Sequence, residues 1–178
     1  MDGPGEDAPI RPVVREAHPE DVPVLLALFW ELAEYERLTD EMHATEELIA
    51  QALFGGRPAA EALIAEWGSE VAGYALFFPT FSSFEATHGI WLEDLFVRPA
   101  HRRGGVGRAL LAAVAARVHG SGGARLEWAA LDWNELALGF YRGVGARTME
   151  SWITHRLVDE PLRRLAHDSE HSHGAWRR

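Results

Sequence analysis

A loop rich in arginine and glycine is the segment of this sequence best suited to chemistry. It runs Val97-Arg-Pro-Ala-His-Arg-Arg-Gly-Gly-Val-Gly-Arg108, and no acidic residue occurs from position 95 to 108. Its cationic side chains are Arg98, Arg102, Arg103 and Arg108. Free amides at a helix N-terminus attract phosphate oxygens, and glycine removes the side chains that would block their approach. The loop is therefore predicted to bind a phosphate-bearing ligand.

The spacing within this loop excludes two common phosphate-binding motifs. A Walker-A loop needs a lysine, and all 17 basic residues of the chain are arginine. The dinucleotide pattern G-x-G-x-x-G also fails, because Leu110 stands where its third glycine belongs. What remains is R-x-x-G-x-G, formed by Arg102, Gly105 and Gly107.

The elements that would position this loop follow from periodicity and turn signals. Strands are predicted over 10–15, 61–67, 71–78, 90–97, 126–131 and 147–157, and helices over 18–36, 45–55, 106–119 and 134–143. Gly68-Ser69 is predicted to turn a hairpin, and Pro79–His88 to form a polar and aromatic connection. This order predicts one α/β domain with a mixed sheet.

Composition narrows the chemistry further. The chain has 178 residues, 47% of them hydrophobic, and a formal net charge of −10, as expected of a globular domain. Without cysteine or lysine it has no disulfide, no thiolate zinc site, no cysteine nucleophile and no Schiff-base lysine. Residues 1–9 resemble no signal peptide and no apolar stretch is long enough to span a membrane, so we expect a cytoplasmic protein with no membrane or nucleic-acid partner.

The charge is divided along the chain. Residues 1–94 have 19 acidic and 4 basic residues, a net of −15, whereas residues 95–178 have 8 acidic and 13 basic residues, a net of +5. A polyanion and a cation could each find a complementary surface on such a protein, although charges separated in sequence can also mix in space.

The loop, together with a downstream run, resembles the GNAT N-acetyltransferase superfamily. That run contains Asn134, Phe140-Tyr141 and Gly145-Ala146. Trp91-Leu-Glu-Asp-Leu-Phe-Val97, Trp133-Asn-Glu135 and Glu31-Leu-Ala-Glu-Tyr-Glu36 are similar to its spermidine/spermine (diamine) and thialysine acetyltransferases, over about residues 10–157. The resemblance implies an α/β GNAT fold, whose mixed, mostly antiparallel central sheet has splayed strands and flanking helices. We assign it to residues 10–158, with 1–9 a flexible leader and 159–178 a flexible polar tail.

The resemblance implies direct transfer of an acetyl group from acetyl-CoA to an amine, and it assigns roles to residues. Glu93 would be the base and Tyr141 the acid that protonates the departing sulfur. The alternatives are a structural carboxylate at a β-bulge and a packing aromatic. The residues expected to bind acetyl-CoA are Leu95, Phe96, Val97, Arg102, Arg103, Gly104, Gly105, Val106, Gly107, Arg108, Asn134 and Ala137.

The acceptor implied by the resemblance is a small cationic amine, such as a polyamine, a diamine or a thialysine-like amino acid. The residues expected to bind it are Tyr35, Glu36, Glu93, Asp94, Glu127, Glu150 and Trp152. In a regular strand Asp94 would point to the face opposite Glu93. The alternatives are another acceptor, such as a protein N-terminus or an amino-sugar, and an acyl-CoA sensor without turnover.

Two further expectations concern partners. The resemblance implies a homodimer. Histidines at 167, 171 and 173 have a spacing that could chelate a metal weakly, but a polar tail explains them better, and we expect no metal.

Overall fold

A five-stranded sheet contains most of the residues predicted to do chemistry. Its strands are β1 (Val13–Glu16), β2 (Glu61–Trp67), β3 (Glu70–Ser82), β4 (Thr87–Val97) and β5 (Arg125–Trp128). They lie side by side in that order, and every neighbouring pair is antiparallel except β4 and β5, which are parallel. The predicted α/β class with a mixed, mostly antiparallel sheet is confirmed.

The computed structural model describes residues 11–172, so the leader predicted over residues 1–9 lies outside the described part. The chain divides into two compact units, Met1–Ala129 and Ala130–Arg178. The whole sheet belongs to the first unit.

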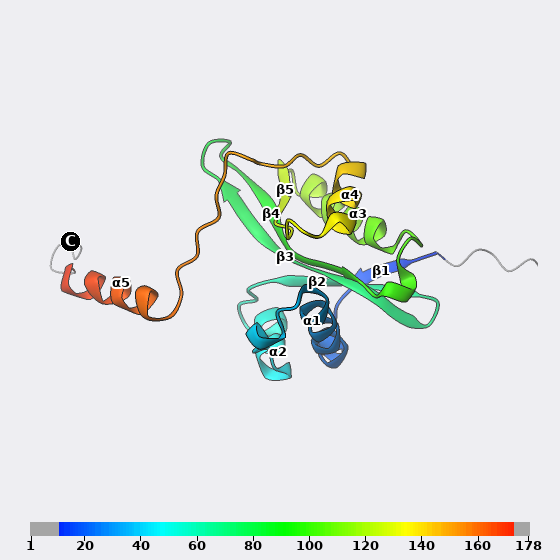
Figure 1. The fold of residues 1–178 in the computed structure, drawn as a ribbon, viewed down its shortest axis with the longest axis horizontal. Coiled ribbons are helices and arrows are strands. Elements are labelled where there is room, and N and C mark those ends of the chain that lie inside the picture. Colours follow the sequence, from blue (N-terminus) through cyan, green and yellow to red (C-terminus); the bar gives the residue numbers. More distant parts are fainter. Residues whose placement is uncertain (1–10, 173–178) are drawn as a thin grey trace, which may run out of the picture. The chain divides into compact units, whose positions relative to one another are not determined.

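Three helices cover the sheet in the first unit (Figure 1). Helices α1 (Val22–Glu36) and α2 (Glu46–Phe54) lie on one side, and α3 (Val106–Gly120) lies on the other. The predicted start of α2 is confirmed, because the Thr45 side chain accepts a hydrogen bond from the amide of Leu48. Short 3-10 turns, η1 (Pro19–Asp21), η2 (Thr39–Glu41) and η3 (Pro99–His101), precede or follow these helices.

The core lies on both faces of the sheet, because β2 and β3 bury alternate side chains on each. On β2, Ala62 and Ile64 pack in one cluster with α1 and α2, whereas the buried Leu63 and Ala65 point to the other face. Strand β4, which precedes the arginine–glycine loop, lies in this sheet between β3 and β5.

The hairpin of β3 and β4 is longer than the sequence predicts. Pro79 pairs with Ile90 and Phe81 with His88, so most of the predicted connection over residues 79–88 is strand. Threonine, phenylalanine and serine continue the ladder there because a neighbouring strand satisfies their backbone groups. Strand β5, by contrast, is shorter at its C-terminal end than predicted: it ends at Trp128, three residues before the predicted end.

The second unit differs most from prediction. Helix α4 (Glu135–Gly143) matches the predicted helix, but residues 147–158 form no strand, so the strand predicted there is wrong. A strand needs a neighbour to satisfy its backbone, and this segment instead exposes Trp152 (73%) and Ile153 (78%). Helix α5 (Asp159–Ser172) follows where a tail without regular structure was expected.

Candidate active site

Strand β4 has one residue more than its partner at the point where two carboxylates follow each other. Leu76 on β3 is opposite Asp94, and Phe77 is opposite Leu92, so Glu93 has no partner residue on β3. An extra residue of this kind is a β-bulge, and it interrupts the regular alternation of side chains.

The bulge brings Glu93 and Asp94 to the same face of the sheet. Leu92 pairs with Phe77, whose ring centre lies 5.5 Å from the guanidinium carbon of an α3 arginine, so Leu92 faces α3 and Glu93 the opposite side. Asp94 shares the face of Phe96, which packs in the core with α1 and α2. Asp94 would point away from Glu93 only in a regular strand, and the bulge removes that regularity.

Asp94 is held by a buried tyrosine. Tyr74 on β3 is fully buried, and its hydroxyl donates a hydrogen bond of 3.0 Å to Oδ2 of Asp94. Burial raises the pKa of Asp94 to about 6, and the charges of Glu93 and Glu36 add to this, whereas the hydrogen bond from Tyr74 lowers it. Asp94 is therefore a carboxylate that titrates close to neutral pH.

Glu93 is exposed but not free to turn. Its Oε2 accepts a hydrogen bond of 2.8 Å from the indole nitrogen of Trp91, two residues earlier on the same face. This contact is with a side chain rather than with the backbone amides of the bulge. Glu93 thus presents a solvent-accessible carboxylate in a defined orientation beside Asp94.

The end of α1 adds a third carboxylate and an aromatic ring. Glu36 is the last residue of α1, and burial raises its pKa. The guanidinium carbon of Arg102 lies 4.6 Å from the centre of the neighbouring Tyr35 ring, a cation–π distance. Because the charge of Glu36 reaches both Asp94 and Tyr74, α1 and β4 contribute to one electrostatic site.

Glu127 joins the same face from β5. It is in register with Trp91 of the parallel neighbour, so the two side chains point to one side of the sheet. The guanidinium of Arg125 lies 2.8 Å from its carboxylate. Glu127 is therefore partly neutralised, unlike the carboxylates on β4.

The second half of β4 has an open edge. Strand β5 pairs with β4 only as far as Leu92. The amide of Arg98 points to β3, where it donates to Ala72, so by alternation the polar backbone groups of Leu95 and Val97 point away from β3 to this open edge. Strand β5 ends at Trp128, so within the described residues no strand pairs with β4 on this side at Leu95 or Val97. Phe96 has its side chain in the core and its backbone toward β3.

The arginine–glycine loop leads from this edge into α3. Gly105 is the N-cap of α3 at φ 86°, a left-handed conformation that glycine adopts without strain, and no side chain caps the helix. The first amides of α3, on Val106, Gly107 and Arg108, therefore remain available to an anion. A side chain at Gly104 would meet the Trp67 ring at 2.9 Å, so glycine is needed there too.

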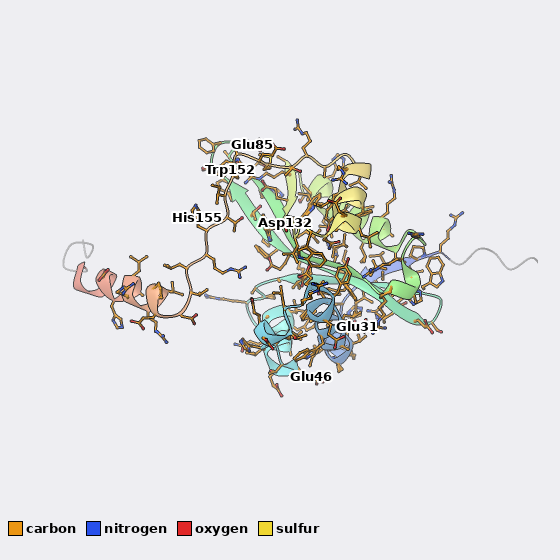
Figure 2. All side chains as sticks on the ribbon, in the orientation of Figure 1. Glu31, Glu46, Glu85, Asp132, Trp152 and His155 are labelled. Atoms are coloured by element: carbon orange, nitrogen blue, oxygen red, sulfur yellow. The ribbon has the colours of Figure 1, made fainter. Side chains whose placement is uncertain are left out.

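The four arginines of the loop divide into two kinds. Arg98 is structural, because it binds both carboxylate oxygens of Glu31 on α1 and the carbonyl oxygen of Val71 (Figure 2 labels Glu31). Arg102 donates its Nε to the carbonyl of Val97.

Arg103 and Arg108 are exposed, and no ion pair of either is found within residues 11–172. These two guanidinium groups, with the uncapped amides of α3, fit a phosphate group.

The remaining predicted residues lie in the second unit. Asn134 caps α4 by accepting a hydrogen bond of 3.2 Å from the amide of Ala137. Tyr141 is half-buried on α4, and its ring centre lies 5.3 Å from that of Phe140 with the two rings tilted by 55°. Glu150 and Trp152 are exposed on the irregular segment after α4, and Figure 2 labels Trp152 there.

Two residues of the site, Trp91 and Tyr74, were not among the predicted site residues. Trp91 could have been found, because a residue two places before Glu93 shares its face in a strand. Tyr74 had no such signal, since its contact with Asp94 depends on the register of β3 against β4 and on the bulge. The part of the chain that the structure describes contains no group of three or more histidine, aspartate or glutamate side chains that could hold a metal.

Known proteins resemble the chain over most of its length. It is 34% identical to the thialysine N-epsilon-acetyltransferase of Bos taurus, covering 86% of this chain and 96% of that protein. It is 32% identical to the L-ornithine N5-acetyltransferase of Arabidopsis thaliana, covering 85% and 86%.

Solved structures share the fold. An integron cassette protein from the mobile metagenome of V. cholerae superposes with a TM-score of 0.74 at 24% identity, covering 88% of this chain and 98% of that one. An aminoglycoside acetyltransferase from a soil metagenome gives 0.71 at 15% identity, covering 84% and 97%.

Residues 23–146 match the model of the acetyltransferase (GNAT) family. The matched region includes the carboxylates of β4, the arginine–glycine loop and α4. Within the described residues, no helix is long and apolar enough to cross a membrane. The chain therefore belongs to the GNAT family of acetyltransferases and is an acyltransferase.

Proposed function

We propose that this enzyme transfers the acetyl group of acetyl-CoA directly to a primary amine of a small cationic acceptor. The acceptor class comprises polyamines, diamines and amino acids of the ornithine or thialysine type. The names of the relatives support this class, since they act on ornithine and thialysine. The observation that carries the proposal is the bulge of β4, which sets Glu93 and Asp94 side by side next to the open strand edge.

The first chemical requirement is a base. An alkylammonium group has a pKa near ~10 and cannot attack a thioester until it loses a proton. Glu93 is exposed, oriented by Trp91, and borders the open edge, so it is the proposed acceptor of that proton, directly or through a water molecule. The neutral amine then forms the new C–N bond at the thioester carbonyl carbon. The nitrogen of the tetrahedral intermediate loses a second proton to solvent as the amide forms, which balances the proton that the leaving thiolate takes up.

The second requirement is stabilisation of the oxyanion and of the leaving thiolate. The amide of Leu95 points to the open edge and would donate to the carbonyl oxygen as negative charge develops. When the C–S bond breaks, the thiolate of CoA needs a proton. Tyr141 is proposed to give it, as the family resemblance implies.

Binding of the two substrates uses separate charges. The pyrophosphate of CoA is proposed to bind the first amides of α3 together with Arg103 and Arg108. The ammonium groups of the acceptor are proposed to bind the carboxylates of Glu36 and Asp94, with Tyr35 and Glu127 beside them in the first unit. Glu150 and Trp152 are proposed as further acceptor-binding residues on the family resemblance alone. No covalent enzyme intermediate is needed, which suits a chain without cysteine or lysine.

Thiol release by the purified protein with acetyl-CoA tests this proposal. The acceptors are putrescine, spermidine, spermine, ornithine and thialysine, and the comparison set is a peptide with a free N-terminus and an amino-sugar. Saturable turnover with at least one cationic amine, at least tenfold above the comparison set in kcat/KM, is the expected result. Turnover confined to the peptide or the amino-sugar would overturn the acceptor class.

We also propose a homodimer in the cytoplasm. The segment over residues 147–158 supports the dimer, because it was predicted to be a strand, forms none in the single chain, and exposes Trp152 and Ile153. Light scattering coupled to size exclusion should give twice the mass of 19.8 kDa. A mass of one chain at micromolar concentration would refute the dimer.

A further inference from the structure

Tyr74 is a polar side chain in the middle of an aromatic core. It is fully buried, and its ring centre lies 5.0 Å from that of Phe29 on α1 and 6.4 Å from that of Phe96 on β4. A phenylalanine would fill this space equally well, and a buried hydroxyl costs free energy unless it is hydrogen-bonded. The hydroxyl donates to Asp94 at 3.0 Å, and that contact is the feature that calls for tyrosine.

We infer that Tyr74 is a positioning residue of the acceptor site: its hydroxyl fixes the Asp94 carboxylate on the Glu93 side of the sheet, ionised and directed at the acceptor's ammonium group. The inference rests on the proposed function, because it takes the acceptor to be a cation. It adds a residue that touches neither substrate and acts through Asp94.

The geometry of the bulge explains why the Asp94 side chain needs a hydrogen-bond donor to fix its position. A bulge weakens the local ladder, and the side chain after it is not fixed by alternation alone. Tyr74 lies diagonally across the β3–β4 pair, because Tyr74 is opposite Phe96 and Asp94 is two residues before Phe96. Its hydroxyl therefore reaches one carboxylate oxygen of Asp94, Oδ2.

The charges around Asp94 also favour a role for the Tyr74 hydroxyl in keeping Asp94 ionised. The groups that act on Asp94 are Glu93 on its own strand, Glu36 on α1 and Tyr74 on β3. Burial and the two glutamates favour the protonated form of Asp94 and raise its pKa, and the Tyr74 hydrogen bond opposes them. Without that hydroxyl, Asp94 would keep its proton to a higher pH and lose its attraction for an ammonium group.

The test is Tyr74→Phe, which removes one oxygen and preserves the ring. We expect the acidic limb of kcat/KM for the amine, placed near pH 6 by Asp94, to move upward by about one pH unit. The ionised fraction of Asp94 then falls about twofold at pH 7 and about fivefold at pH 6, and the KM of the amine rises accordingly. The KM of acetyl-CoA should stay within about twofold of wild type, because the hydroxyl does not touch the loop.

A double-mutant cycle separates positioning from general damage to the core. In an Asp94→Asn background, Tyr74→Phe should have no further effect on kcat/KM. Phe29→Leu is the matched control: it disturbs the same aromatic cluster and should lower the melting temperature without moving the acidic limb. If Tyr74→Phe reduces kcat/KM equally with and without Asp94, the inference is wrong.

A titration of the Asp94 side-chain carbon by NMR gives a readout independent of turnover. It should show a higher midpoint in Tyr74→Phe than in wild type and the wild-type midpoint in Phe29→Leu. An unchanged midpoint in Tyr74→Phe overturns the inference even if an amine is acetylated. If no cationic amine is acetylated, the proposed function fails. The inference is then decided by whether Tyr74→Phe needs more spermidine at pH 6 than wild type does to perturb the Asp94 signal, and an equal requirement overturns it.

Discussion

The indole nitrogen of Trp91 lies 2.8 Å from Oε2 of Glu93, and both side chains project from the same face of β4. Glu93 is the extra residue of the bulge and has no partner residue on β3. Its side chain is therefore held less firmly by the ladder than a side chain of a regular strand. The hydrogen bond from Trp91, on the same strand, orients the Glu93 side chain instead.

Replacing Trp91 by phenylalanine should therefore slow the chemical step. The variant keeps an aromatic ring but lacks the N–H, so Glu93 loses its fixed orientation, and kcat should fall about 3- to 10-fold with a smaller change in KM for the amine. Steady-state kinetics with acetyl-CoA measure both constants. Trp30→Phe is the control, since Trp30 is 41% exposed on α1 and should leave kcat unchanged. A Trp91 variant that changes only the KM of the amine would contradict a role in orienting Glu93.

Glu93→Gln should abolish most turnover without preventing CoA binding. The amide has nearly the shape of the carboxylate and can still accept from Trp91, but it cannot take up a proton, so kcat should fall by about 10²–10⁴-fold. Tyr141→Phe should also lower kcat, because the leaving thiolate loses its proton donor. Calorimetry with CoA should give a Kd within about threefold of wild type for both variants. A Glu93→Gln enzyme with more than a tenth of wild-type kcat would exclude Glu93 as the base.

Arg103 and Arg108 should determine affinity for the cofactor's phosphates. Each substitution by glutamine removes a charge near the N-terminus of α3, and the KM of acetyl-CoA should rise about 3- to 10-fold per site. Salt should weaken binding to wild type more than to the double variant, because exposed charges are screened. Arg57→Gln removes an exposed arginine outside the loop and serves as the control. Equal effects at Arg57 would show that only the overall charge matters.

Gly104→Ala should displace the loop, because the new side chain would collide with the ring of Trp67. The added methyl group would lie 2.9 Å from two carbons of the Trp67 ring, closer than van der Waals contact permits. We expect the KM of acetyl-CoA to rise while the KM of the amine changes little. Trp67→Leu, which opens space above the loop, should restore part of the affinity in the double variant. Additive losses in that variant would argue against this contact.

Asp94→Asn should weaken binding of the amine and increase the free energy of unfolding. The pKa of Asp94 is about 6 in the folded protein and about 4 in an unfolded chain, so ionisation of Asp94 costs stability that grows from pH 4 to pH 6 and persists above it. Asparagine removes that cost. At pH 8 the free energy of unfolding should therefore increase by roughly 1–3 kcal/mol relative to wild type, and the gain should vanish near pH 4.

Urea unfolding of both proteins at pH 4 and pH 8 measures this difference. The same variant should bind the cationic amine more weakly at pH 8, because its side chain has no charge. A variant that is less stable than wild type at pH 8 would mean that Asp94 supports the fold rather than the acceptor site.

Much of the molecule is determined by local sequence. The helical spacing of Val22, Leu25 and Phe29 predicts α1. Thr45 predicts the start of α2, and the glycines after Arg103 predict the loop and the start of α3. Each of these features depends on neighbouring residues alone, because helix periodicity, capping and turn formation are local interactions. The family resemblance rests on the same local motifs.

The orientation of the two carboxylates of β4, by contrast, depends on contacts between distant parts of the chain. The sequence places Glu93 and Asp94 next to each other, but a regular strand would send them to opposite faces. The register of β3 against β4 inserts a bulge at Glu93, turns Asp94 to the same face, and brings the Tyr74 hydroxyl to it. Pairing register and burial arise from contacts between residues distant in sequence, so no pattern around Asp94 alone predicts its partner or its raised pKa.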